Sequence, residues 1–208
     1  MDKSKELNLI AQQIRALSQT GLAYSTSEYD TERYTEMVKL SNRIVSLISG
    51  QEEEFIDSLY LPAKEYVTPK TDIRAVVFNA NDEVLLVKER FDGKWSLPGG
   101  WADVGFTPKE IAVKEVKEET GLDVEAIRLL AVMDMSRHSH PAIPFYVYKY
   151  FILCKVTGGT FNEAFDIQDK GFFNLQELPP LSLERVVPEQ ITTMYEYYKN
   201  PDKEVYLD

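Results

Sequence analysis

The sequence predicts an α/β protein, a mixed-sheet α/β/α sandwich preceded by a small all-helical domain. Three observations support this class. Residues 1–66 show helical periodicity without a convincing strand, residues 73–90 begin a series of β-branched runs, and helix signals follow Thr107 and Pro188. An order of strand, helix, strands and helix is typical of a mixed sheet rather than of a strictly alternating parallel fold. We therefore expect a helical domain over residues 1–66 and a sandwich over residues 67–208.

Two amphipathic helices are expected in the first domain. Apolar residues recur at steps of three and four in the first helix, at Leu7, Ile10, Ile14 and Leu17, and a second set runs from Tyr34 to Ile48 and stops at Gly50. A short third helix is expected within residues 52–60. These helices bury too little surface to stand alone, so the apolar stripe must dock on the rest of the chain or on a second copy. We expect a homodimer through this segment.

The second domain begins after a proline-containing linker at residues 61–71. Residues 73–90 predict a β-hairpin, because β-branched runs flank an Asn/Asp-rich turn at residues 79–82. Further strands are expected within 127–136, 145–157 and 171–175. A final helix is expected after Pro188, with Ile191, Met194, Tyr195 and Tyr198 on its inner face.

Composition restricts the partners of the chain. Asp and Glu number 34 against 23 for Lys and Arg, a formal net charge of −11 that argues against binding long nucleic acid. No apolar run approaches a membrane span, and the first residues lack a cleavable apolar core. The single cysteine, Cys154, lies in an apolar run and is interpreted as a buried hydrophobe. We expect a soluble protein of the reducing cytoplasm.

A helix over residues 108–120 carries the chemistry. Thr107 and Pro108 form a start signal, Gly121 ends the helix, and its spacing places Glu115, Glu118 and Glu119 on one side. The opposite side is apolar, with Ile111, Ala112 and Val116. A solvated face salt-bridged by Lys114 and Lys117 would explain the charges alone. The preceding "LPGGW" loop favours a Mg²⁺ or Mn²⁺ site, because these ions prefer carboxylates and carbonyls.

Residues 99–122 resemble the signature of the Nudix hydrolases. That signature is glycine, five residues, glutamate, seven residues, then Arg-Glu-apolar-x-Glu-Glu-x-Gly-apolar. Its glycine falls on Gly100 and its terminal block on residues 114–122, with the spacing kept. Phe106 replaces the first glutamate and Lys114 the arginine, a pair that braces the loop in the family. We expect Phe106 packing and a contact from Lys114 to Asp103 to hold the loop instead.

The resemblance implies metal-dependent hydrolysis of a nucleoside diphosphate linked to another group. The helical extension and the words "GGWADVG" and "HSHP" are similar to a bacterial subgroup that cleaves CDP-choline, so CDP-choline is the first expected substrate and ADP-ribose the next. Cleavage of RNA ends and a non-catalytic ligand sensor are alternatives. A sensor can shed its metal glutamates, whereas all three remain here.

Roles for individual residues follow from this interpretation. The metal site is expected at Glu115 and Glu119, with the Gly99 carbonyl and Glu118 beside them. The catalytic residues are expected to be Glu119, with Glu118 or a loop acid as base, Asp169 before Asp166. The expected substrate contacts are Arg74, Arg90, Trp101, Arg137, His138 and His140. The two histidines lack the further ligands that a zinc site needs.

Overall fold

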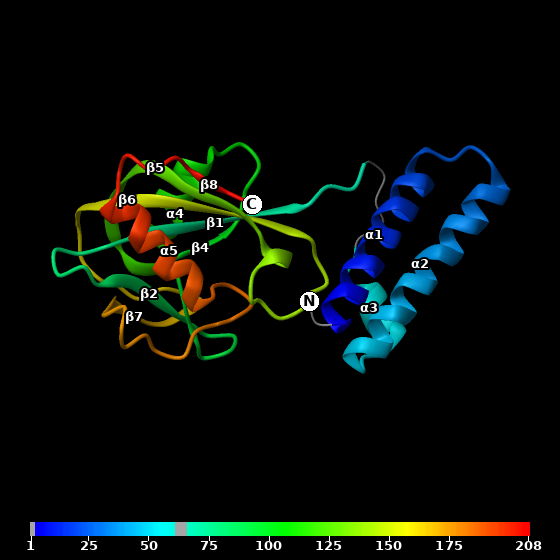
Figure 1. The fold of residues 1–208 in the computed structure, drawn as a ribbon, viewed down its shortest axis with the longest axis horizontal. Coiled ribbons are helices and arrows are strands. Elements are labelled where there is room, and N and C mark those ends of the chain that lie inside the picture. Colours follow the sequence, from blue (N-terminus) through cyan, green and yellow to red (C-terminus); the bar gives the residue numbers. More distant parts are fainter. Residues whose placement is uncertain (1–2, 61–65) are drawn as a thin grey trace. The chain divides into compact units, whose positions relative to one another are not determined.

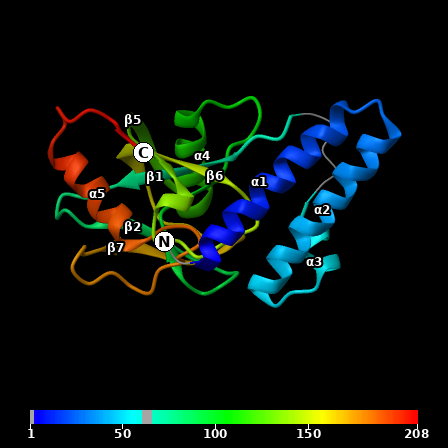
Figure 2. The same ribbon diagram turned by 45° about the vertical axis from the view of Figure 1, so that its right-hand side comes forward.

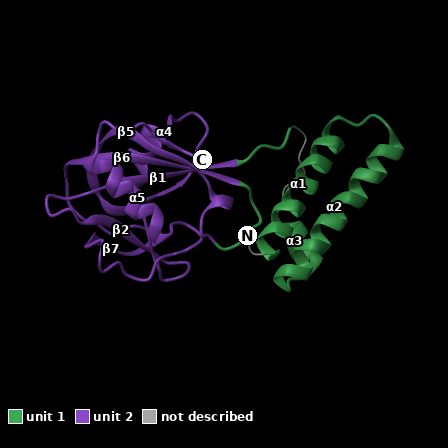
Figure 3. Ribbon diagram, in the orientation of Figure 1, with its two compact units in different colours: residues 1–69, 141–146 green, residues 70–140, 147–208 purple. Residues whose placement is uncertain are grey.

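The chain was analysed as a computed structural model, which describes residues 3–60 and 66–208. It divides into two compact units (Figure 3). The first contains residues 1–69 together with 141–146, and the second contains residues 70–140 and 147–208. Residues 61–65 of the expected linker lie outside the described part. The sequence did not indicate that residues 141–146 would belong with the helices.

The first unit is a helical hairpin with a short third helix. Helix α1 spans Lys3–Tyr24, α2 spans Glu28–Ser49 and α3 spans Glu53–Ser58. Figures 1 and 2 show α1 and α2 side by side and antiparallel. The Ser27 side chain caps the start of α2, and Gly50 ends it in the left-handed conformation, as the sequence predicted.

The face that α1 buries is mostly polar. Its buried residues are Asn8, Ala11, Arg15 and Ser18, whereas Leu7, Ile10 and Leu17 of the apolar stripe are exposed, so these three do not dock on the rest of the described chain. Arg15 is held by Asn42, by Asp57 at 3.1 Å, and by the Tyr60 ring, whose centroid lies 3.6 Å from the guanidinium carbon. The polar face turns inward because these contacts give Asn42, Asp57 and Tyr60 as partners to the guanidinium within the unit, with only its Nε left without a hydrogen bond among the described residues.

The second unit contains two sheets. The five-stranded sheet has the order β4-β1-β6-β5-β8, and the three-stranded sheet has the order β3-β2-β7 (Figure 1). The strands span Lys70–Val77 (β1), Val84–Glu89 (β2), Trp95–Ser96 (β3), Gly99–Trp101 (β4), Leu122–Asp134 (β5), Val147–Gly159 (β6), Ile167–Phe173 (β7) and Tyr206–Leu207 (β8). Strand β1 runs parallel to β6 and antiparallel to β4, so the sheet is mixed.

Strands β1 and β2 do not form the expected hairpin ladder. Both edges of β1 are already paired, with β4 and β6, and β2 pairs with β3 and β7 in the other sheet. A single bridge between Phe78 and Val84 joins the two strands. The turn itself is present, because the Asn79 side chain accepts from the N–H groups of Asn81 and Glu83 at 2.9 and 3.0 Å.

Helices α4 (Pro108–Thr120) and α5 (Pro188–Lys199) cover different cores of the sandwich. Ile111, Ala112 and Val116 of α4 pack into one buried cluster, and Ile191 and Met194 of α5 pack into the other. Strand β1 contributes alternate residues to the two clusters, which is the strand period of two. The predicted α/β/α sandwich after a helical region is confirmed. Among the described residues, no helix is long and apolar enough to cross a membrane.

Candidate active site

The loop and helix that carry the signature are fixed by local hydrogen bonds. The Thr107 side chain caps α4, and the Glu110 carboxylate reaches back to the Thr107 N–H at 2.8 Å. Pro108 occupies the first turn and Gly121 ends the helix with a φ of 85°. The helix therefore starts and ends where the sequence predicted. The three glutamates of the predicted site project from its last two turns.

Glu119 is the buried carboxylate of the site, with 6% of its surface exposed. Its Oε2 accepts a hydrogen bond of 3.1 Å from the Gly99 N–H, and the expected role of the Gly99 carbonyl as a metal ligand stays a prediction. Only glycine fits there, because a Cβ on Gly99 would lie 2.0 Å from the Ile73 carbonyl oxygen. Burial, helped by the charges of Glu115 and Glu89, raises the pKa of Glu119 well above its usual range.

Glu115 lies beside the same loop, whereas Glu118 is exposed and pairs with Lys114. A Cβ placed on Gly100 would meet Glu115 Oε1 at 3.4 Å, so that carboxylate faces the glycine pair. Burial raises the pKa of Glu115 against the opposing charges of Lys114 and Arg74. The Glu118 side chain is exposed and lies 3.4 Å from the Lys114 ammonium. The structure therefore brings two of the three predicted glutamates to the loop.

The donor set fits a divalent ion that is completed by substrate. Within the described ranges, no group of three or more acidic, His or Cys side chains is close enough to hold an ion, so the expected three-glutamate cluster is not formed. Mg²⁺ is usually held by one or two carboxylates together with phosphate oxygens and water. Glu115 and Glu119 supply that number of hard ligands, and burial raises the pKa of both carboxyl groups.

Arg74 is buried beneath the site, which corrects its expected contact with substrate. It is 5% exposed, and it donates to Asp72 at 2.9 Å and to the Leu97 carbonyl at 3.0 Å. Lys149 also binds Asp72. Burial alone would raise the pKa of Asp72, but the charges of Arg74 and Lys149 lower it to about 2. The positive charge of Arg74 lowers the pKa of Glu115 and Glu119 and so stabilises their ionised forms. Because the Arg74 side chain is buried, it does not bind a phosphate of the substrate.

The "SRHSH" segment also differs from expectation. His140 is 2% exposed, and its Nδ1 lies 2.7 Å from the Leu183 carbonyl oxygen. Burial lowers its pKa to about 4, so it is neutral near pH 7 and is not a cationic phosphate ligand. His138 Nε2 lies 3.1 Å from an Asp208 carboxylate oxygen, and Arg137 remains exposed. Both histidines are thus engaged with the C-terminal part of the chain.

The two loop acids have different positions. Asp169 lies on β7 next to Lys170, whose ammonium donates to the Glu119 carbonyl at 3.2 Å. The Asp169 carboxylate accepts from the Lys170 N–H at 2.8 Å, and its expected role as the base stays a prediction. Asp166 precedes β7 and lines a pocket of about 730 Å³ together with Arg90, an expected substrate residue.

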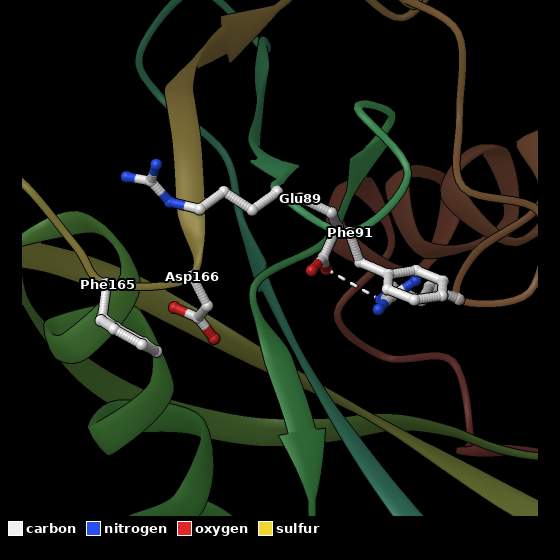
Figure 4. Close-up of a pocket in the computed structure, with 6 residues that line it drawn as sticks. Glu89, Phe91, Phe165 and Asp166 are labelled. Carbon is white, nitrogen blue, oxygen red and sulfur yellow. Dashed lines mark ion pairs between the residues drawn. The ribbon is translucent and has the colours of Figure 1, made fainter.

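Four residues of that pocket were not identified from the sequence. They are Glu89, Phe91, Phe165 and Arg185 (Figure 4). Glu89 forms an ion pair of 3.0 Å with Arg185, and its charge acts on Arg74 and Glu119. The available signal was a phenylalanine followed directly by an aspartate in each of two turn-rich segments, "ERFDG" and "EAFDI".

The replacement for the family's loop brace was predicted in part. Lys114 Nζ donates to Asp103 Oδ2 at 3.0 Å, so the expected contact is confirmed. Phe106 is 51% exposed, and the expected packing of this ring is therefore incomplete. Trp101 is half exposed, with the Lys70 ammonium 5.2 Å from its ring centroid. This indole can accept a cation on its face.

Comparison with known families agrees with this geometry. Residues 68–196 match the family model described as NUDIX domain. Residues 5–60 match the one described as UDP-X-like, N-terminal oligomerisation domain. The chain therefore belongs to the Nudix family and is a hydrolase.

Its relatives include proteins similar over nearly the whole chain. It is 44% identical over 198 residues to the Bacillus subtilis protein named "Putative ADP-ribose pyrophosphatase YjhB", and the aligned residues cover 95% of each chain. A crystal structure of an ADP-ribose pyrophosphatase from Streptococcus suis is 45% identical with a TM-score of 0.62, covering 68% of this chain and 100% of that one. A crystal structure of UDP-X diphosphatase is 32% identical, with a TM-score of 0.64 over 99% of both chains.

Proposed function

We propose that the protein hydrolyses the pyrophosphate bond of ADP-ribose or a similar nucleoside diphosphate, with Mg²⁺ or Mn²⁺ bound at Glu115 and Glu119. One observation carries the proposal. A buried Glu119 carboxylate is fixed by the Gly99 N–H, and Glu115 lies next to it at the same glycine pair. Two neighbouring carboxylates are suited to share a cation with the phosphates of a substrate.

The chain's own groups then divide the work. When bound, a divalent ion screens the charge of the pyrophosphate and acidifies a coordinated water. The Gly99 N–H orients Glu119, and the buried Arg74 limits the cost of holding two carboxylates together. We nominate the exposed Glu118 as the group that takes the water proton when the oxygen attacks phosphorus and the P–O–P bond breaks. Arg90 is the proposed phosphate contact, because it lines the adjoining pocket.

ADP-ribose is the first proposed substrate because the Bacillus relative that matches over 95% of this chain carries that name. CDP-choline is the second candidate. The half-exposed Trp101 ring already carries the Lys70 ammonium near its face, and a quaternary ammonium could bind there in the same manner. The two candidates differ in both the base and the leaving group, so one substrate panel separates them.

The test is a panel of ADP-ribose, CDP-choline, a UDP-sugar and a short 5′-triphosphate RNA, each incubated with Mg²⁺ or Mn²⁺. Products are separated by chromatography. We expect AMP and ribose 5-phosphate from ADP-ribose at the highest kcat/KM, and no product when the metal is chelated. Absence of hydrolysis of every compound in both metals would refute an enzymatic role.

We also propose that the protein is a homodimer formed through its first unit. The exposed apolar residues of the two long helices, Leu7, Ile10, Leu17, Leu40 and Leu47, support this assembly. The match of residues 5–60 to an oligomerisation domain supports it as well. Burying such a stripe against a second copy would remove apolar surface from water, which favours association.

A further inference from the structure

The pocket that contains Asp166 is formed by two neighbouring segments. Glu89 ends β2, and Arg90 and Phe91 follow it, whereas Phe165 and Asp166 precede β7. The Arg90 N–H donates to the Asp166 carbonyl at 2.9 Å, and its guanidinium donates to the Ile167 carbonyl at 3.4 Å. These backbone contacts fix the two segments side by side. The pocket of about 730 Å³ is within the size range of sites for small ligands.

Two phenyl rings stand at the rim of this pocket. Phe91 is 85% exposed and Phe165 is 97% exposed. In Figure 4 these rings lie on either side of the Asp166 and Glu89 carboxylates. Neither ring belongs to the buried clusters of the second unit, so neither is required by the core. Two exposed rings on one pocket offer apolar faces on which a planar ligand can stack.

The charges of the lining favour a neutral ring over a free anion. Arg185 Nε lies 3.0 Å from Glu89 Oε1, and the Ser96 hydroxyl donates to the same oxygen at 2.9 Å. This ion pair is therefore satisfied within the protein. Arg90 and Asp166 add one positive and one negative charge, and the lining is neutral overall. A polyanion would gain little from such a site unless its phosphates extended beyond it.

Glu89 connects the pocket to the two-carboxylate site. Ser96 donates to the Glu89 carboxylate at 2.9 Å. In the same short segment the Leu97 carbonyl accepts from Arg74 and the Gly99 N–H donates to Glu119, so this segment links Glu89 to the proposed metal ligands. A substrate whose pyrophosphate lies at Glu115 and Glu119 can therefore extend one end into the pocket. In a nucleoside diphosphate derivative, the end that is flat, neutral and able to stack is the base.

We propose that this pocket binds the nucleobase of the substrate between Phe91 and Phe165, with the Asp166 carboxylate accepting a hydrogen bond from an exocyclic amine. This assignment rests on the proposed function and extends it. Stacking on phenyl rings accepts any base, so selection falls to Asp166. Adenine, cytosine and guanine carry an exocyclic amine, whereas uracil has none and presents a carbonyl oxygen that a carboxylate repels.

Binding to metal-free protein tests the stacking. AMP and ribose 5-phosphate are titrated into the wild-type chain and the double variant Phe91→Leu/Phe165→Leu, with affinities measured by NMR line shifts. We expect AMP affinity to fall at least about tenfold in the double variant, because leucine keeps apolar volume and removes the flat face. Ribose 5-phosphate, which lacks a base, should bind both proteins equally.

A matched control is Phe161→Leu. Phe161 is an exposed ring in the same part of the chain, but it lies near Phe172, at 6.2 Å between centroids, and does not line the pocket. AMP should bind this variant as it binds the wild type. Equal AMP affinity in the wild type and the double variant, or no AMP binding to the wild type, would overturn the assignment.

The role of Asp166 is tested by the ratio of affinities for AMP and UMP. We expect wild type to prefer AMP, and Asp166→Asn to reduce that preference because an amide can donate to the uracil carbonyl. An unchanged ratio would overturn the selection by Asp166. These measurements need no turnover. Failure of the substrate panel with intact AMP binding would count against the proposed function, and hydrolysis with unaltered binding in the double variant would count against the pocket.

Discussion

Helix α4 of the second unit and helix α1 of the first both carry apolar residues at steps of three and four, but they present them to different surroundings. In α4, Ile111 and Val116 are buried in the core of the second unit. Two of its glutamates lie at the glycine loop, and the third is exposed. In α1, Leu7 and Leu17 are exposed and the buried residues include Asn8 and Arg15.

This difference shows what a periodic pattern specifies. Spacing determines which side chains share a face of a helix, but the partners available to that face determine whether it turns inward. Asn8 donates to the Ile143 carbonyl, and Arg15 has Asp57 and Asn42. The polar side chains of α1 thereby find hydrogen-bond partners inside their own unit. Its exposed apolar residues are available to bind a second copy of the chain.

The substitution Glu119→Gln tests the active face of α4 and should have the largest effect. We expect kcat for ADP-ribose to fall by about 10³-fold or more, because a metal ligand loses its charge. The unfolding free energy of the metal-free variant should not fall, since a neutral amide suits this buried position. Steady-state kinetics and urea denaturation measure the two effects.

The control for that substitution is Glu125→Gln on β5, an exposed acid outside the site. It should retain wild-type turnover. Full activity in Glu119→Gln would show that hydrolysis occurs at another place on the molecule.

The buried His140 of the second unit makes the stability of the protein depend on pH. The pKa of His140 falls from 6.5 to about 4 on burial, so the unfolded chain takes up a proton first as the pH drops. The contribution of the neutral, buried His140 to the free energy of unfolding is therefore fully present above pH 6.5, and it is lost as the pH falls toward 4. By linkage, we expect a loss of about 2 kcal/mol near pH 5 from this group.

Urea denaturation near pH 7 and near pH 5 measures that loss. His140→Gln should lose less stability over this interval than the wild type does. An identical pH dependence in His140→Gln and wild type would contradict the burial argument.

The sequence was sufficient for the features that depend on local rules. Thr107, Pro108 and Gly121 gave the ends of α4, and the spacing of the glutamates gave the family. The Lys114 contact with Asp103 also followed, because both residues lie on one loop and its adjoining helix. Local hydrogen bonds and helical geometry are encoded over short distances along the chain.

The features that were missed depend on pairing between distant segments. Burial of Arg74 follows from its strand's pairing with β6, which brings Lys149 and Asp72 together. The predicted hairpin of β1 and β2 was wrong because a turn reverses the direction of the chain but does not determine which strands then pair with each other. The pocket joins the end of β2 to the start of β7 through the contact of Arg90 with Asp166, a pairing that no local pattern in either segment indicates.

The substitution Leu17→Glu tests the exposed face of α1. If that face covers a second copy, a charge at this 68% exposed leucine should raise the dimer dissociation constant by at least about tenfold. Analytical ultracentrifugation over a concentration series measures the constant. Thr35→Glu places the same charge on an exposed position of α2 that is not three or four residues from Leu40 or Leu47, and it should leave the constant unchanged. A wild-type chain that sediments as a monomer would contradict the proposed assembly.

The smallest effect is expected for Lys114→Met, which removes the replacement brace of the glycine loop. The ion pair with Asp103 is partly exposed, so its contribution to stability is small and the fold should persist. Looser placement of the loop should reduce kcat/KM by about two- to fivefold through a rise in KM, because the loop orients Glu119 by way of Gly99. Lys114→Arg, which keeps the charge and the reach to Asp103, should restore the wild-type KM. A loss in Lys114→Met as large as that in Glu119→Gln would mean that Lys114 contacts the substrate directly, and the brace would then be the wrong description of this residue.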